Sequence, residues 1–235
     1  MKIATHSDQC LSFIHSQLDP RAKQPLPPPK LRPAVTISRQ CGCGAMAIAT
    51  ELAEFLQARA PAKCHWTVFD KNLVAKVLEE HKLPQAIAKF MPEDHVSAIQ
   101  DAVEEILGLH PPTLTLWQHT AATIRHLAEL GQVILIGRGA TAITRQMSNV
   151  FNVRLIAPLE TRVQHIMVSN QLDHPAALKW VQQSDRGRQR FLKAHFHTDI
   201  DDPLEYDLII NTGRIPPPVV ARLIGEAVAQ WTETL

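Results

Sequence analysis

Hydrophobic and polar positions along the chain predict strands and helices in regular alternation. Short runs of β-branched and aliphatic residues, typical of strands buried on both faces, occur at 35–37, 64–70, 133–136, 150–157 and 206–211. Segments with apolar residues at helical spacing lie between them. Because strands and helices alternate five times, we expect an α/β fold in which right-handed crossovers build a five-stranded parallel sheet flanked by helices.

The expected helices are marked by apolar residues on one face. They cover residues 48–56, 72–81, 96–106, 116–130, 158–167 and 176–196, and a closing helix begins at 216–218. The closing helix places Val220, Leu223, Ala227 and Trp231 on one face. They mark the apolar face of this helix.

The first 33 residues differ from the rest of the chain. Residues 1–19 contain an amphipathic helix candidate, and the prolines concentrated between residues 20 and 33 favour an extended connector. We therefore expect an N-terminal helix and a proline-rich linker over 1–33, and one folded domain over 34–235.

Composition narrows the class of protein. A chain of 235 residues is long enough for one sizeable α/β domain with a peripheral extension. The formal net charge of +1 gives no reason to expect binding to nucleic acid or to a membrane. No apolar run approaches the length of a bilayer span, and the N-terminus lacks the pattern of a signal peptide. We expect a cytoplasmic protein.

The cysteines and the acidic run at 195–203 contain residue types that bind metal ions, but each has a simpler interpretation. Cys10, Cys41, Cys43 and Cys64 fit neither a disulfide framework nor paired zinc ligands, which predicts free thiols. A redox or metal pair at Cys41 and Cys43 is the alternative. Residues 195–203 hold two histidines and three carboxylates, which suit a metal, although the same density is typical of a polar loop. We expect no metal site.

The segment after the first strand has the composition of a phosphate-binding loop. Gly42 and Gly44 break the apolar run, and a helix follows them. Glycines let the backbone approach a ligand closely, and a helix N-terminus turns N–H groups towards it. The general pattern G-x-x-x-x-G-K-[ST] carries a lysine and then a hydroxyl after its last glycine. Here those two positions hold Ala45 and Met46.

Three charged residues are expected at the same edge of the sheet, since ligands bind beyond the carboxyl ends of parallel strands. Arg39 either supplies positive charge to the loop or is a solvated turn residue. Arg138, between two glycines after the strand 133–136, suits bidentate binding of a phosphate, and pairing with a carboxylate is its alternative. Asp70 also follows a strand end.

A basic segment covers residues 185–193. Arg186, Arg190 and Lys193 fall on one helical face, and Arg188 points away from it. Mobile cations of this kind can close over a phosphoryl group during its transfer, and a solvated helix face is the alternative.

Motifs across residues 34–213 resemble the cytidylate kinase-like family, relatives of the bacterial cytidylate kinases among the P-loop nucleoside-monophosphate kinases. The matching segments are 37–49, 69–71, 133–140, 157–162, 185–196, 202–208 and 211–212. The resemblance implies a P-loop kinase fold with a helical region that binds the nucleoside monophosphate and a basic lid over about 176–204. It also implies transfer of the ATP γ-phosphate to CMP, dCMP or a related small acceptor, with Mg²⁺.

The resemblance also implies roles for individual residues. The ATP-binding positions are Arg39, Gly42, Cys43, Gly44, Ala45 and Met46. The acceptor-binding positions are Asp70, Arg138 and Asp185, and the catalytic arginines are Arg138, Arg186 and Arg188.

Ala45 and Met46 support an alternative function. A lysine between the β- and γ-phosphates stabilises charge in the transition state, and methionine offers magnesium no oxygen. A nucleotide-binding or regulatory protein that has lost catalysis on the same fold is therefore the alternative. Helices of the region 94–130, or the N-terminal helix, offer apolar faces through which the chain could form oligomers.

Overall fold

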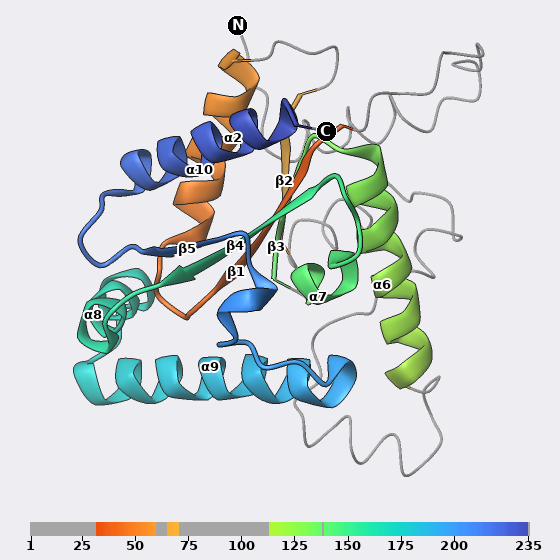
Figure 1. The fold of residues 1–235 in the computed structure, drawn as a ribbon. Coiled ribbons are helices and arrows are strands. Elements are labelled where there is room, and N and C mark those ends of the chain that lie inside the picture. The colour runs from red at the N-terminus through yellow and green to blue at the C-terminus, as the bar shows by residue number, and fades with distance from the viewer. Residues whose placement is uncertain (1–31, 60–64, 71–112, 138, 235) are drawn as a thin grey trace, which may run out of the picture.

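The computed structural model describes residues 32–59, 65–70, 113–137 and 139–234. In these ranges the chain forms a sheet between helices, with a helical hairpin at one end of the strands (Figure 1). The predicted N-terminal helix, most of the linker, the helices at 72–81 and 96–106, and Arg138 lie outside the described residues.

One sheet of five parallel strands organises the fold. The strands are β1 (Ala34–Arg39), β2 (Thr67–Phe69), β3 (Val133–Ile136), β4 (Val150–Ile156) and β5 (Leu208–Asn211). They are arranged in the order β2-β3-β1-β4-β5, with every pair parallel. In the central strand, Val35 lies opposite Ile134 of β3 and Phe151 of β4. The predicted five-stranded parallel sheet is confirmed.

β2 begins three residues and β5 two residues later than the apolar pattern predicts, and in each case an N–H before the strand donates to a partner outside the sheet. The N–H of Trp66 donates to Oε1 of Gln57 at 2.9 Å, and β2 begins one residue later. The N–H of Tyr206 donates to the carbonyl of Pro203 at 3.2 Å and closes a turn, so β5 begins only at Leu208.

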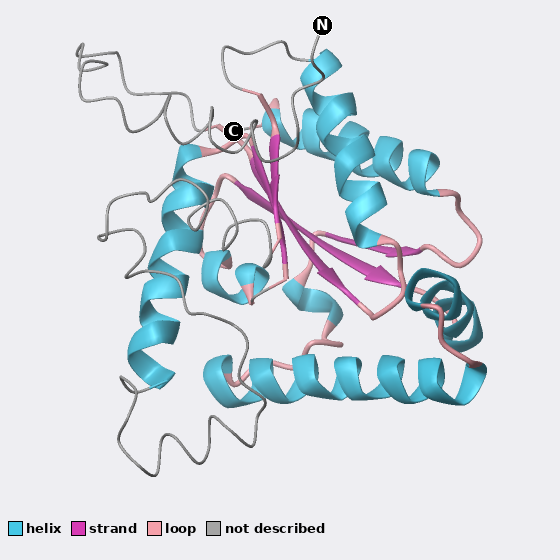
Figure 2. Cartoon of the chain, turned by 180° about the vertical axis from the view of Figure 1, so that it is seen from behind, coloured by secondary structure: helices cyan, strands magenta, loops and turns pink. Residues whose placement is uncertain are grey.

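Helices cover both faces of the sheet (Figures 1 and 2). α2 (Ala45–Arg59) and α10 (Pro217–Thr232) pack on the face that includes Val35 and Ile37. α6 (Thr113–Leu130) and α7 (Ala140–Thr144) pack on the opposite face, where Ala34 belongs to the core. This division follows from the alternation of side chains along β1. Among the described residues, no helix is both long and apolar enough to cross a membrane.

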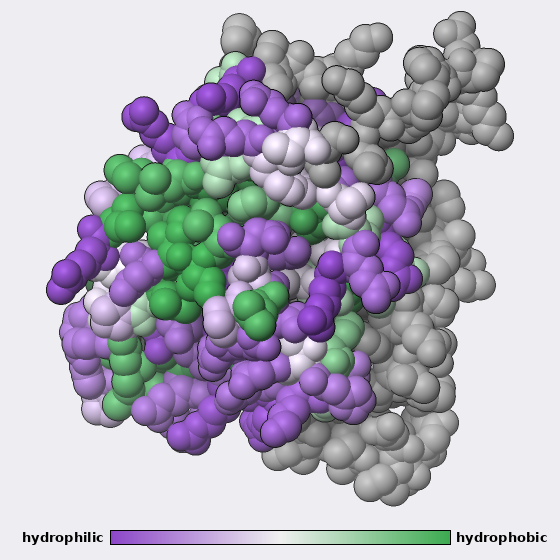
Figure 3. Space-filling view, in the orientation of Figure 1, coloured by the Kyte–Doolittle hydropathy of each residue, from purple (hydrophilic) through white to green (hydrophobic). Residues whose placement is uncertain are grey.

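The buried face of α10 differs from the prediction at one residue. Val220 is fully buried and Trp231 packs against the core, as expected, but Leu223 is 48% exposed. The helix turns the i, i+4 series Val220, Ile224 and Val228 to the sheet, and Leu223 lies beside that series. Figure 3 shows apolar side chains gathered over β5 and the start of α10, two elements on which Ile209 and Leu223 are exposed.

α8 (Leu159–Asn170) and α9 (His174–Phe196) form the hairpin at the carboxyl end of the strands (Figure 1). α9 begins two residues before the predicted position because Asp173 caps it. The Asp173 carboxylate accepts a hydrogen bond from the N–H of Ala176 at 2.9 Å, and Pro175 fits the first turn.

Candidate functional site

The loop between β1 and α2 lies at the carboxyl end of the sheet. Both of its glycines are left-handed, with φ of 85° at Gly42 and 71° at Gly44. A β-carbon at Gly42 would lie 2.5 Å from the carbonyl oxygen of Arg162, whereas one at Gly44 would meet no heavy atom within 4 Å. Gly42 is therefore required for packing against α8, and Gly44 borders open space.

The N–H groups of this loop and of the first turn of α2 have no acceptor in the described part of the chain. The hydrogen bonds among described residues use none of the N–H groups of residues 42–47. Successive donors of this kind at a helix N-terminus fit the oxygens of a phosphate. Ala45 and Met46 carry no side-chain oxygen, so this turn suits the oxygens of a phosphate but offers no side-chain ligand to a metal ion.

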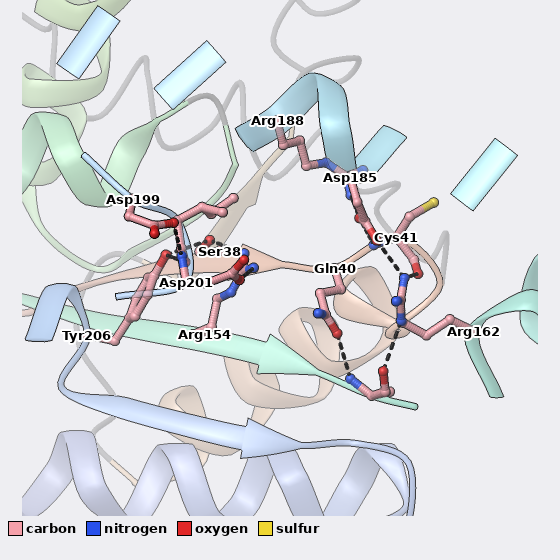
Figure 4. Close-up of polar contacts among 12 residues, drawn as sticks. Ser38, Gln40, Cys41, Arg154, Arg162, Asp185, Arg188, Asp199, Asp201 and Tyr206 are labelled. Carbon is pink, nitrogen blue, oxygen red and sulfur yellow. Dashed lines mark hydrogen bonds and ion pairs between the residues drawn. The ribbon is translucent and has the colours of Figure 1, made fainter. Parts of the chain in front are cut away.

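The helical hairpin holds the start of the loop through a buried ion pair (Figure 4). Asp185 of α9 accepts from the N–H of Cys41 at 2.7 Å with Oδ1, and from Nη1 of Arg162 at 2.6 Å with Oδ2. Arg162, whose side chain is 8% exposed, also donates to the carbonyls of Cys41 at 3.2 Å and Ala157 at 2.9 Å. These contacts join the loop to β4, α8 and α9.

Two further contacts hold the loop, one to the residue after β4 and one to α8. Oε1 of Gln40 accepts from the N–H of Ala157 at 3.0 Å, and Nδ1 of His165 lies 2.8 Å from the carbonyl oxygen of Gly42. Sequence reasoning assigned no role to Arg162, Gln40 or His165. Arg162 could have been found, because it closes the A-P-L-E-T-R motif at 157–162, whereas the other two carry no such signal.

Both loop cysteines are buried free thiols, with exposures of 7% at Cys41 and 3% at Cys43. Burial raises the pKa of the Cys43 thiol and keeps it protonated. The prediction of free thiols is confirmed for these two residues, which fill the base of the loop.

Arg39, Asp70 and Arg188 come together beside the loop. The guanidinium of Arg39, at the end of β1, packs against Gly137 in the turn after β3. Burial, and then the positive charge of Arg188, lower the pKa of Arg39 to about 10, and the Asp70 carboxylate acts in the opposite direction. Arg188 donates to Oδ1 of Asp185 at 3.2 Å. Residues at the end of β1, directly after β2 and on α9 are thus close enough for their charges to act on one another.

The orientation of α9 differs from the sequence interpretation. Arg188, which helical spacing separated from the other basic residues, is half-buried and contacts Asp185. The cause is the packing of Ala177 and Val181 on α8, which directs positions 185 and 188 to the loop. The basic residues exposed to solvent are Arg186, Arg190 and Lys193.

A second polar cluster surrounds Ser38 of β1, apart from the contacts that hold the loop (Figure 4). Arg154 of β4 is 4% exposed and donates to Oγ of Ser38 and Oδ1 of Asp201, both at 2.9 Å. The hydroxyl of Tyr206 donates to the carbonyl of Ile200 at 2.7 Å, and the Arg154 guanidinium lies 5.8 Å from the centre of the Tyr206 ring. The cluster ties the segment after α9 to the sheet.

The acidic run has structural partners. Besides the ion pair of Asp201, Asp199 accepts from the N–H of Asp201 at 3.0 Å, and Asp202 accepts from the N–H of Leu204 at 2.9 Å. Within the described residues, no three His, Cys, Asp or Glu side chains are placed to hold a metal ion.

We expect Tyr206, which is the only tyrosine of the chain, to ionise above pH 10 in the folded protein. Burial raises the pKa of its hydroxyl above 10 in the native state only. Its contribution to stability is therefore complete below pH 10 and is lost as the pH rises through the native pKa. Absorbance of tyrosinate, measured during a pH titration of native and urea-unfolded protein, checks this. A native midpoint at or below the unfolded one would contradict it, and Tyr206→Phe supplies the blank.

The chain is similar in sequence to known proteins. Residues 34–214 match the cytidylate kinase-like family. The chain is 27% identical over 97 residues to a uronate isomerase of Corynebacterium glutamicum and 27% identical over 104 residues to a cytidylate kinase of Methanocaldococcus jannaschii. These matches cover 41% and 43% of this chain, but only 19% and 58% of the length of those relatives.

A solved structure shares the fold. It is that of an uncharacterized protein from Eubacterium ventriosum, with 18% sequence identity and a TM-score of 0.62, and the match covers 85% of this chain and 99% of that one. Since the family match extends from β1 to beyond β5, the chain belongs to the cytidylate kinase-like family.

Proposed function

We propose that the protein transfers the γ-phosphoryl group of ATP to CMP, dCMP or a related small acceptor. The observation that carries this proposal is the loop after β1, where two left-handed glycines lead into α2 and the N–H groups of residues 42–47 have no acceptor among described residues. Phosphate oxygens satisfy such donors, and the helix dipole favours their charge. Family membership and the similarity to a cytidylate kinase support the class of acceptor.

In this proposal the ATP phosphates lie on the loop and the acceptor lies towards the ends of β2 and β3. Asp70 and Arg138 follow these two strands and would bind the acceptor. Asp185 would contribute while it holds Cys41 and Arg162. Arg188 of α9, which contacts Asp185 beside the loop, would bring positive charge to the phosphates. Mg²⁺ would be bound mainly through phosphate oxygens and water, where it neutralises charge.

Ala45 and Met46 favour a second candidate function, the binding of nucleotide without turnover. The loop retains its backbone donors, and at these two positions it lacks the lysine and the hydroxyl of the general motif. Binding relies on the donors, whereas the lysine acts mainly on charge that develops during transfer.

The two functions are separated by assaying the full chain with ATP, Mg²⁺ and each of CMP, dCMP, UMP and AMP. We expect turnover with CMP or dCMP, and a loss of about 100-fold or more in kcat/KM for Arg138→Ala, because a charged contact to the phosphates is removed. Turnover of the wild type no greater than that of Arg138→Ala contradicts the kinase function. Retained ATP binding by calorimetry in that case supports the second candidate.

A further inference from the structure

The phosphate-loop pattern contains a second departure, in front of the missing lysine. In G-x-x-x-x-G-K-[ST] the first glycine precedes the second by five positions. With Gly44 as the second glycine, the first falls on Arg39. The chain therefore has an arginine where the pattern has glycine and an alanine where it has lysine. Compared with the pattern, the loop lacks the positive charge of a lysine at position 45 and has the positive charge of Arg39 at its other end.

The fold places this arginine between two ligand-binding segments. Arg39 is the last residue of β1, directly before the loop, and its guanidinium packs against Gly137 in the turn after β3. A β-carbon at Gly137 would lie 2.7 Å from Cζ of Arg39, so the turn accepts the guanidinium only because residue 137 is glycine. One side of Arg39 thus adjoins the loop, and the other adjoins the segment proposed for the acceptor.

The charge of the Arg39 guanidinium is not held in an ion pair within the described ranges. Arg39 forms no hydrogen bond or ion pair with another residue that the structure describes. Burial and the charge of Arg188 both disfavour its charged form, yet its pKa of about 10 keeps it charged at neutral pH. A half-buried cation beside a second cation is a binding site for an anion.

We propose that Arg39 supplies, to the phosphoryl group in transfer, the positive charge that a lysine at position 45 supplies in the general motif. This inference rests on the proposed kinase function. In the reaction, an oxygen of the acceptor phosphate forms a bond to the γ-phosphorus while the bond from that phosphorus to the bridging oxygen of ADP breaks. Arg39 gives and takes no proton. Its planar fork binds two of the phosphoryl oxygens, on which negative charge is spread during transfer.

The test uses the full chain as wild type, Arg39→Gln, the double variant Arg39→Gln/Ala45→Lys, and Arg222→Gln as a control on the exposed face of α10. We expect Arg39→Gln to lower kcat by about 100-fold or more. The double variant should recover at least about tenfold of that loss, because lysine returns a charge to the loop. Without nucleotide, Arg39→Gln should raise the melting temperature by about 2–4 °C, since it removes a half-buried charge that has no ion pair among the described residues. Arg222→Gln should match the wild type.

Three results overturn the inference. A kcat of Arg39→Gln within about threefold of wild type shows that the charge is not used in transfer, while the proposed function stands. A double variant no faster than Arg39→Gln contradicts the equivalence with lysine. A melting temperature of Arg39→Gln well below wild type assigns Arg39 a structural role. Absence of turnover in the wild type itself overturns the proposed function, and the two failures are thereby distinguished.

Discussion

Replacing Gly42 by alanine is expected to lower the free energy of unfolding by about 2–5 kcal/mol and to abolish ATP binding. A left-handed conformation costs an alanine about 1–2 kcal/mol. The new β-carbon would also lie 2.5 Å from the carbonyl oxygen and 2.9 Å from the Cα of Arg162, and such an overlap adds about 1–3 kcal/mol. Relief of this overlap moves the loop away from α8 and from the ion pair of Arg162 with Asp185. Urea unfolding and calorimetry with ATP measure the two effects.

Gly44→Ala is the matched control, because φ is positive at both glycines and only the surroundings differ. A β-carbon at Gly44 meets no heavy atom within 4 Å, so only the backbone term of about 1–2 kcal/mol is expected. The same β-carbon enters the open space in which we place a phosphate, and ATP affinity should fall by about tenfold or more. Equal destabilisation by the two substitutions would contradict the packing role of Gly42. Unchanged ATP affinity in Gly44→Ala would contradict the placement of a phosphate on this loop.

Replacing Asp185 by asparagine is expected to lower the free energy of unfolding by about 2–4 kcal/mol. The substitution removes the counter-ion of Arg162, whose side chain is 8% exposed, and leaves a buried charge unpaired. We place the effect below the largest values for buried pairs because Asp185 itself is 28% exposed. The amide oxygen can still accept from Cys41, but the amide N–H₂ group cannot accept from Arg162. Urea unfolding at neutral pH measures the loss.

Glu160→Gln on α8 serves as the control for Asp185→Asn. Glu160 is also a carboxylate of the hairpin with hydrogen-bond partners, Gln164 and His174, but its side chain is 64% exposed. Water therefore solvates it, and its exchange for glutamine should leave the unfolding midpoint unchanged. If Asp185→Asn is as stable as this control, the ion pair does not hold the loop.

The architecture could be predicted from residues that act locally. The apolar run Val133–Ile136 predicted β3 with its observed bounds, and the other strand patterns predicted a parallel sheet because helices separate them. The predicted bounds were wrong where a side-chain hydrogen bond determines the residue at which an element begins. The cap at Asp173 began α9 early, and the bond from Trp66 to Gln57 shortened β2. Leu223 was misplaced because the packing of α10 against α2 and the sheet, rather than its own periodicity, chose its buried face.

The strand–loop–helix unit could be predicted from the sequence alone, with Gly42 and Gly44 in place and no lysine after them, since these features depend on neighbours along the chain. The surroundings of the loop depend instead on contacts between segments that are far apart in the sequence. The tertiary structure brought Asp185 from α9 and Arg162 from α8 to Cys41, and it turned Arg188 inward and Arg186 outward. The physical reason is that the rotation of α9 is set by burial of Ala177 and Val181 against α8, a contact between helices that no local pattern of charges records.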